Sequence, residues 1–378
     1  MSPSRREFLR TLSLASAGLA AGCASLRPVA RRRRLPPVHV AANREIRTVV
    51  GLRPFRASGF CVRADRLGDK LVVHNYGHGG SGVTMSWGTG DLATRLALEG
   101  LGGSTARNVA VIGSGAVGLA AARLLQLRGA TVTVYTAALP PDTTSNIAGA
   151  QWFPFYAYGH GALVGAFREQ FLAAARFSYR WFQSLVGGGY GVRWMTNYHL
   201  DDAPPARETG LLGLQSPIRE LIPELGDIPP DAHPFAAPFA RRFDTMMIEP
   251  PLYLSQLLRD VRLAGGNIVL RRFDSAAELA TLPEPTLVNC TGLGARTLFG
   301  DDELVPVKGQ LTVLLPQPEV DYAVLYNDLY MFSRRDGVLL GGTHEEGVET
   351  LEPNLVAKER ILDGHARLFQ WAATRGLS

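Results

Sequence analysis

The sequence predicts an α/β fold, and three observations support this. Residues 108–135 read as a five-residue apolar strand, a glycine-containing turn, an apolar-striped helix that ends at Gly129, and a β-branched strand. This succession is a complete βαβ opening. Hydrophobic residues make up 46% of the chain and charged residues 19%, a balance typical of a globular protein rather than a disordered or fibrous one. With 378 residues the chain is long enough for two or three domains.

The turn after the first strand of this unit has the spacing of a dinucleotide-binding loop. Gly113, Gly115 and Gly118 stand where such a loop needs a tight turn, close approach to a pyrophosphate, and close packing of helix on strand. Ala116 and Val117 begin the helix, whose N-terminus would face the phosphates. Because a strand precedes the loop and a helix follows it, we expect a bound dinucleotide rather than an ordinary tight turn.

One part of the usual dinucleotide pattern is missing. An acidic residue about 20 residues after the glycines normally hydrogen-bonds the ribose hydroxyls. Tyr135, Thr136, Ala137 and Ala138 supply none, and the first acid beyond them is Asp142. This weakens an NAD interpretation and favours FAD, a longer cofactor that other segments can hold along its length.

The net charge of +5 does not belong to the body of the protein. Eight of the 39 Lys and Arg residues and one of the 34 acids lie in residues 1–34, so 31 bases face 33 acids in the remainder. A nucleic-acid-binding protein needs its excess of basic residues on a folded surface. We therefore expect no nucleic-acid partner.

The first 44 residues read as a signal and a linker. Arg5 and Arg6 precede a weakly hydrophobic stretch of 12 residues, which resembles a bacterial twin-arginine signal and is too short to span a membrane, which takes about 20 residues. Cys23 stands where a lipoprotein is acylated. We expect a signal over residues 1–23, a tether over 24–44, and a periplasmic protein that is either cleaved and soluble or anchored through a lipid on Cys23.

Cysteine usage gives no sign of a metal site or a disulfide framework. Besides Cys23 the chain has only Cys61 and Cys290, and neither lies in CxxC spacing. We expect no metal and no thiol chemistry.

Six further segments carry a more specific pattern. They are GLRPFR (51–56), HNYGHGGSGVT (74–84), TTSNIAGAQWFP (143–154), VNCTGLGA (288–295), VKGQ (307–310) and YNDLY (326–330). Together with the dinucleotide loop they resemble the D-amino-acid oxidase and D-aspartate oxidase family. The resemblance implies an FAD-binding Rossmann-like domain (45–160 and 245–300) intertwined with an antiparallel-sheet substrate domain (161–244 and 301–378).

The order of these segments differs from that of the family. GLRPFR and HNYGHGG normally follow the dinucleotide and YNxxY segments, whereas here they precede them. The chain order is therefore predicted to be circularly permuted, with residues 100–107 (GLGGSTAR) as the new joint. The new ends, near Arg44 and Leu377, should lie close in space, because permutation is tolerated where chain ends are near one another.

The resemblance implies an activity and four residues at the reacting centre. The activity is oxidative deamination of a D-amino acid: a hydride passes from Cα to N5 of FAD, and the products are a 2-oxo acid and ammonia. The electron acceptor is either oxygen, which gives hydrogen peroxide, or another acceptor, as in a dehydrogenase. Arg53 matches the carboxylate-binding arginine, whose planar fork suits a bidentate pair. Tyr330 matches a tyrosine that binds the same carboxylate, and Tyr326 matches one on a mobile lid. The carbonyl of Gly80 would accept a hydrogen bond from the substrate amine.

The resemblance also assigns FAD-binding residues outside the dinucleotide loop. Hydroxyl and small residues would lie at the phosphates and ribose: Thr143, Thr144, Ser145, Ala148 and Gly149. A glycine-rich run and the start of a helix would lie at the isoalloxazine ring, where glycine permits close approach and N–H groups favour negative charge: Gly79, Gly80, Ser81, Gly82, Val83 and Thr84. His78 within this run is expected to be structural rather than a general base.

The sequence leaves the substrate side chain open. Phe153 predicts an apolar wall that favours neutral or hydrophobic D-amino acids over D-aspartate, which needs a second cation. Arg56 and Arg335 are the candidates for that cation. Two alternatives to D-amino acid oxidation remain: a flavin enzyme acting on glycine, sarcosine or another amine, and a non-catalytic exported protein on a degenerate flavoenzyme fold.

Overall fold

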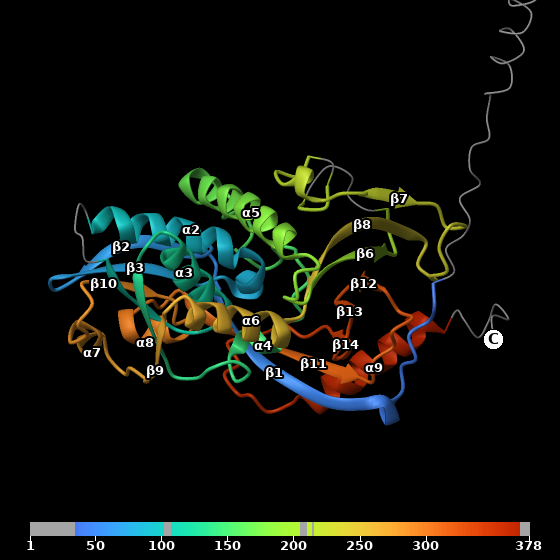
Figure 1. Ribbon diagram of the computed structural model, residues 1–378. Coiled ribbons are helices and arrows are strands. Elements are labelled where there is room, and N and C mark those ends of the chain that lie inside the picture. The colour runs from blue at the N-terminus through green and yellow to red at the C-terminus, as the bar shows by residue number, and fades with distance from the viewer. Residues whose placement is uncertain (1–34, 102–106, 205–209, 214, 371–378) are drawn as a thin grey trace, which may run out of the picture. The chain divides into compact units, whose positions relative to one another are not determined.

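Two β-sheets carry the fold of this computed structural model, which describes residues 35–101, 107–204, 210–213 and 215–370 (Figure 1). One sheet has six strands in the order β2-β3-β10-β4-β5-β9. The other has nine strands in the order β1-β11-β14-β13-β12-β6-β8-β7, with β15 paired to β11. The prediction of an α/β fold with a nucleotide-binding sheet and a second sheet is confirmed. The predicted signal and Cys23 lie outside the described residues.

The six-stranded sheet is mostly parallel. Its strands are β2 (Cys61–Leu67), β3 (Lys70–Tyr76), β4 (Asn108–Ile112), β5 (Thr131–Thr136), β9 (Asn267–Leu270) and β10 (Thr286–Asn289). Only β2, at the edge, runs antiparallel to its neighbour. The central strand β4 is apolar on both faces, with Val109 and Val111 in one buried cluster and Ala110 and Ile112 in another. Such strands are typical of a sheet covered by helices on both sides.

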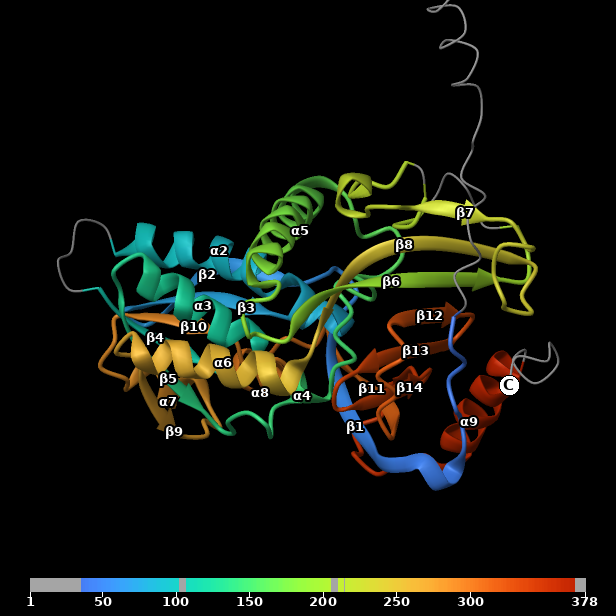
Figure 2. The same cartoon turned by 45° about the vertical axis from the view of Figure 1, so that its right-hand side comes forward.

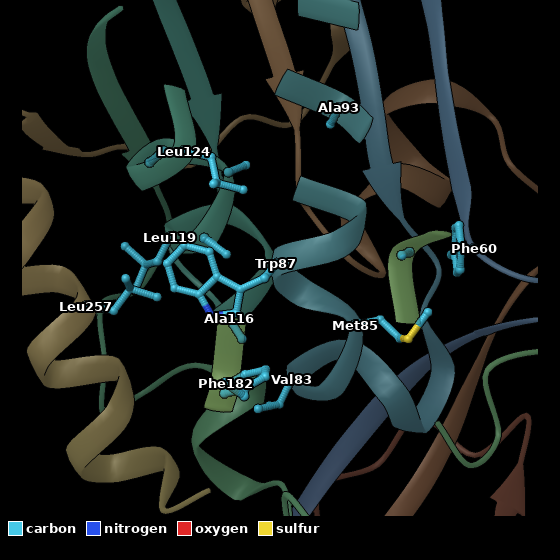
Figure 3. Close-up of a cluster of buried hydrophobic side chains, with 14 of the residues drawn as sticks. Phe60, Val83, Met85, Trp87, Ala93, Ala116, Leu119, Leu124, Phe182 and Leu257 are labelled. Carbon is cyan, nitrogen blue, oxygen red and sulfur yellow. The ribbon is translucent and has the colours of Figure 1, made fainter. Parts of the chain in front are cut away.

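Helices cover both faces of this sheet. The larger cluster holds α2 (Gly82–Gly100), α3 (Ala116–Leu127), α5 (Gly165–Leu185) and α6 (Pro250–Leu263); the smaller holds α7 (Ala276–Ala280) and α8 (Gly294–Phe299). Figure 3 shows Trp87 of α2 lying against Leu119 of α3, with Leu257 of α6 beside them. Burial of these side chains is what fixes α2 and α3 against the sheet.

The nine-stranded sheet is antiparallel except where β12 runs parallel to β6. Its strands are β1 (Glu45–Arg56), β6 (Val192–Asp201), β7 (Gly226–Ile228), β8 (Phe239–Ile248), β11 (Leu304–Leu314), β12 (Tyr322–Tyr326), β13 (Leu329–Arg334), β14 (Gly337–Gly341) and β15 (Glu345–Glu346). Helix α9 (Leu355–Phe369) packs beside β13 and β14 (Figure 2). The short helices are α4 (Thr144–Ile147), η1 (Ala42–Arg44), η2 (Gly79–Ser81) and η3 (Arg219–Leu221).

Two segments lie elsewhere than the expected domain boundaries put them. Strand β1 was expected with the nucleotide-binding part, but it pairs with β11 from Glu45 to Arg56, because β11 satisfies the backbone groups along its inner edge. Helix α5 was expected in the substrate domain, but it packs on α2, where the Ser178 hydroxyl accepts a hydrogen bond from Gly88 N at 2.8 Å. The chain therefore crosses between the two domains at other positions than the predicted boundaries.

The start of β1 lies beside the last described helix. Lys358 Nζ of α9 is 3.1 Å from Glu45 Oε2. Leu377, the other residue of the predicted pair of ends, lies outside the described residues. In the predicted joint, α2 ends at Gly100 and β4 begins at Asn108, while residues 102–106 are not described. No described helix has the length and apolar character needed to cross a membrane.

Candidate active site

A cavity of about 1080 Å³ is lined by residues of both sheets. Ligand pockets for drug-sized molecules measure about 300–1,000 Å³, so this volume suits a dinucleotide together with a small substrate. The β4–α3 turn lines one part through Gly113, and Arg53 of β1 and Tyr330 of β13 line another. Segments far apart in the sequence therefore meet at one site.

The dinucleotide loop forms the phosphate end of the cavity. Gly113, Gly115 and Val117 line it, as do Thr143, Thr144 and Ser145 of the segment that enters α4. Gly113 has φ +112°, and a Cβ there would lie 2.5 Å from the Cys290 carbonyl oxygen, so only glycine fits this turn. Gly115 has no side chain to cap the N-terminus of α3, and both Gly115 and Val117 line the cavity. The N–H groups of a helix N-terminus suit an anionic phosphate.

Three of the predicted cofactor residues do not line the cavity. Ala116 is buried, and its N–H donates to Ser145 Oγ at 3.0 Å. Gly118 packs against the loop, where a Cβ would lie 2.0 Å from the Gly113 carbonyl oxygen. Ser81 is buried and donates to the Phe155 carbonyl at 2.5 Å. These three residues lie behind the cavity wall. The Ala116 N–H and the Ser81 hydroxyl are hydrogen-bonded within the protein, and Gly118 packs against the dinucleotide loop.

The end of β9 supplies the residues that sequence reasoning missed. Arg271, Arg272, Phe273 and Asp274 line the cavity next to Ala137 and Ala138, where the usual acid is absent. They arrive there because β9 runs parallel to β5, so the carboxyl ends of both strands meet at one edge of the sheet. Arg271 Cζ lies 4.6 Å from the centre of the Phe273 ring. The sequence around β9 carries no motif that identifies these residues in advance.

The glycine-rich run after β3 forms another part of the wall. Gly79, Gly80, Gly82, Val83 and Thr84 line the cavity, and α2 begins at Gly82, close to the predicted start of a helix or turn near Val83. Ala148 and Gly149, after α4, line it as well. Gly80 is fixed by its N–H, which donates to the Tyr156 carbonyl at 3.1 Å.

Two titratable residues in this wall are held neutral. Burial lowers the pKa of His78 to about 3, and the Thr89 hydroxyl, 2.9 Å from His78 Nε2, occupies one ring nitrogen. Burial raises the pKa of the Cys290 thiol well above its ordinary value. Neither group is suited to proton transfer near neutral pH, so His78 has the geometry of a structural residue.

Arg53 and Tyr330 lie on the same face of the nine-stranded sheet, and each rests on a glycine. A Cβ at Gly309 would lie 2.4 Å from both Nη atoms of Arg53, and a Cβ at Gly341 would lie 2.1 Å from Tyr330 Cζ. Arg53 Nη1 donates to the Thr343 carbonyl at 3.3 Å. The guanidinium is therefore held flat against the sheet with its remaining donors free to face the cavity.

The pair is suited to binding a carboxylate. Burial raises the pKa of the Tyr330 hydroxyl, although the neighbouring Arg53 guanidinium acts in the opposite direction. Tyr330 thus stays protonated as a hydrogen-bond donor. Within the part of the chain that the structure describes, no carboxylate forms an ion pair with Arg53. A planar arginine without an internal acidic partner, next to a phenol, matches a carboxylate of the ligand.

Tyr326 lies outside this arrangement. Side chains alternate along a strand, and on β12 it is Leu325 that lines the cavity, whereas the Tyr326 hydroxyl donates to Asp202 Oδ1 at 2.7 Å. Tyr156 lines the cavity instead, stacked on His344 with ring centres 4.8 Å apart. Tyr326 was predicted to lie on a lid over the substrate, but its side chain points to Asp202 and does not line the cavity.

Comparison with known proteins agrees with this geometry. The family model described as FAD dependent oxidoreductase matches residues 108–374. The chain belongs to this family of FAD-dependent oxidoreductases. The D-amino-acid oxidase of Rubrobacter xylanophilus is 31% identical over 272 residues, which cover 70% of this chain and 77% of that protein. The D-aspartate oxidase of Homo sapiens is 28% identical over 267 residues, covering 68% and 74%.

Solved structures show the same fold at lower sequence identity. Glycine oxidase from Bacillus cereus superposes with a TM-score of 0.56 at 16% identity, covering 71% of this chain and 79% of that chain. Glycine oxidase from Geobacillus kaustophilus gives a TM-score of 0.53 at 14% identity, covering 71% and 80%. The family match and the curated relatives disfavour the alternative of a non-catalytic protein: this is an FAD-dependent oxidoreductase related to amino acid oxidases.

In this FAD-dependent oxidoreductase, neither candidate for a second cation reaches the cavity. Arg56 Nε is 2.9 Å from Asp301 and its Nη2 2.7 Å from Glu303. Arg335 is exposed on its side chain and lies near Glu249. Neither is among the residues that line the cavity. The expectation that Arg56 or Arg335 binds a substrate side chain was therefore wrong. Arg56 is paired with acidic residues of the protein, and the Arg335 side chain points to solvent.

Proposed function

We propose that this enzyme oxidises D-amino acids. The observation that carries the proposal is the placement of Arg53 and Tyr330 together on the floor of the cavity that the dinucleotide loop enters. The names of the two curated relatives support the same substrate class. Arg53 and Tyr330 would hold the α-carboxylate, and the carbonyl of Gly80 would accept a hydrogen bond from the amine.

The reaction is a two-electron oxidation. When bound, FAD supplies the acceptor for the hydride that leaves Cα. The C–N bond of the substrate becomes an imine as the amine loses a proton, and water then releases a 2-oxo acid and ammonia. With oxygen as the final electron acceptor, hydrogen peroxide would form. The residues of the chain contribute positioning, since a carboxylate fixed at two points fixes the direction of the Cα hydrogen.

A spectrum of the purified protein tests the proposal. We expect visible flavin absorbance that bleaches without air on addition of a D-amino acid and not of its L-enantiomer, and peroxide formation when air is admitted. Arg53→Leu should keep the absorbance and lose the bleaching. Bleaching by glycine or sarcosine but by no D-amino acid would replace the proposal with the amine-oxidising alternative.

We further propose that the chain order is circularly permuted. Two observations support it: the family model begins at residue 108, and residues 45–100 supply β1, β2, β3 and α2, which pack within the same two sheets as the matched part. A rearranged chain running from 108 to 370, then through a short linker to 45–100, should fold and bind FAD. Failure of this chain to fold, when the natural order folds under the same conditions, would contradict the proposal.

We also propose export by the twin-arginine route to the periplasm and a lipid anchor on Cys23, on the sequence pattern of residues 1–23 alone. Replacing Arg5 and Arg6 by lysine in a fusion to an export reporter should abolish export, and Cys23→Ala should abolish lipid labelling. Export that is insensitive to the first change would reject the route, and unchanged labelling would reject the anchor.

A further inference from the structure

The part of the cavity wall that would face the substrate side chain runs along one row of the nine-stranded sheet. Tyr330 is paired with Leu325, and Leu325 with His199, in the registers of β13, β12 and β6. All three line the cavity. Directly paired residues share a face, and strands lie about 4.8 Å apart. The row therefore leads from the carboxylate-binding tyrosine, past an apolar side chain, to an imidazole about 10 Å away.

Gln151 lines the cavity next to the end of this row. Its Nε2 donates to Asn197 Oδ1 at 2.5 Å, and Asn197 precedes His199 by two residues on β6, which places both on one face. Asn197 Nδ2 in turn donates to the Met195 carbonyl at 2.8 Å. Because this second bond fixes Asn197 Oδ1 as an acceptor, the Gln151 amide must offer its nitrogen to Asn197. Its carbonyl oxygen Oε1 is what remains for a ligand.

His199 has a similar polarity. Its Nδ1 is 3.0 Å from Asp201 Oδ2 and donates to it, so Nε2 is the ring nitrogen that remains for a ligand, as an acceptor when the ring carries one proton. Arg241, the partner of His199 on β8, is bound to Asp227 at 2.8 Å and does not line the cavity. Both polar side chains at the end of the row thus present acceptors.

We propose that Gln151 and His199 select D-amino acids whose side chain has an apolar stem and ends in a hydrogen-bond donor, such as an amide, a hydroxyl or an ammonium group. This inference rests on the proposed oxidation of D-amino acids. The same acceptors reject D-glutamate and D-aspartate, because a side-chain carboxylate would face two acceptors without a donor, and its desolvation would go uncompensated. Leu325, between Tyr330 and His199, contacts the stem.

D-Glutamine, D-glutamate and D-norleucine test this selection, because they have similar size and differ in the end group. For the natural protein we expect kcat/KM for D-glutamine to exceed the values for D-glutamate and D-norleucine by about tenfold or more, the scale of one hydrogen bond that is made or missed in a closed site. Gln151→Leu should lower kcat/KM for D-glutamine by about tenfold and leave D-norleucine within about twofold.

Two further variants keep the test decisive. His199→Phe removes the second acceptor without touching the buried Gln151–Asn197 pair, so it carries the test if Gln151→Leu does not fold. Gln183→Leu makes the same chemical change on the exposed face of α5 and should leave kcat/KM unchanged for all three substrates. Equal rates for D-glutamine and D-glutamate in the natural protein, or a parallel loss for D-glutamine and D-norleucine in both cavity variants, would overturn the inference. Oxidation of D-norleucine would meanwhile keep the proposed function intact, whereas no bleaching by any D-amino acid would reject both.

Discussion

Gly309→Ala tests whether the position of Arg53 on the sheet sets substrate affinity. The new Cβ would lie 2.4 Å from Nη1 and Nη2 of Arg53 and 2.5 Å from its Cζ. An ordinary contact needs about 3.4 Å, so the guanidinium must move by about 1 Å away from the sheet. A misplacement of this size costs about 100-fold in rate, equivalent to about 2.7 kcal/mol of transition-state stabilisation.

The assay separates this displacement from general damage. We expect kcat/KM for a D-amino acid to fall by about 100-fold, mainly through KM, with affinity for benzoate as a carboxylate probe falling in parallel. The flavin spectrum should not change, because Gly309 and Arg53 lie on β11 and β1 of the nine-stranded sheet, whereas the dinucleotide loop follows β4 of the six-stranded sheet. Gly226→Ala on β7, where a Cβ would meet nothing within 4 Å, is the matched control.

A folded, FAD-loaded Gly309→Ala protein with kcat/KM within about twofold of the natural value would mean that Arg53 does not hold the carboxylate in this position. If the variant does not fold, Arg53→Lys provides the comparison, because a lysine cannot reproduce the bidentate fork and should show the same pattern of loss.

Further predictions concern single residues. Tyr330→Phe removes one donor to the carboxylate and should raise KM by about tenfold with little change in thermal stability, measured by steady-state kinetics and melting. Burial lowers the pKa values of His74, His78 and His365 to about 4, 3 and 4. As the pH falls below about 6.5, these histidines take up protons in the unfolded chain but not in the folded chain. Stability should therefore be complete near pH 7 and fall by up to about 1.4 kcal/mol per pH unit for each histidine towards pH 4, and a flat unfolding free energy from pH 7 to 5 would disprove this. Trp87→Ala should cost about 3–5 kcal/mol in urea unfolding, because the ring is fully buried between helices; a loss below about 1 kcal/mol would contradict the packing in Figure 3.

Local patterns were enough to predict the nucleotide-binding part. The loop at Gly113 and Gly115 follows a strand and opens a helix, and both neighbours are short and contiguous in sequence. Backbone chemistry of this kind depends on residues within about thirty positions, so a single segment specifies it. The same holds for the start of α2 near Val83.

Side-chain placement across the sheet depended on pairing between distant strands. Tyr326 and Tyr330 look equivalent in the sequence, but the register of β12 on β13 puts Leu325 on the cavity face and turns Tyr326 towards Asp202. A shift by one residue reverses every side chain of a strand, and no local pattern fixes that register. Arg56 was likewise a candidate cation for a substrate side chain, but in the folded protein it is paired with Asp301 and Glu303, which the sequence does not place beside it.

By itself the sequence determined the βαβ unit, which depends on residue type and short spacing, and its resemblance to the D-amino-acid oxidase family implied FAD and singled out Arg53 as the carboxylate ligand to test. Only the tertiary structure decided that β1 joins β11, that the Gln151 amide nitrogen pairs with Asn197, and that the end of β9 lines the region without an acid. Those features come from contacts between residues more than forty positions apart, whose geometry exists only once the two sheets have packed.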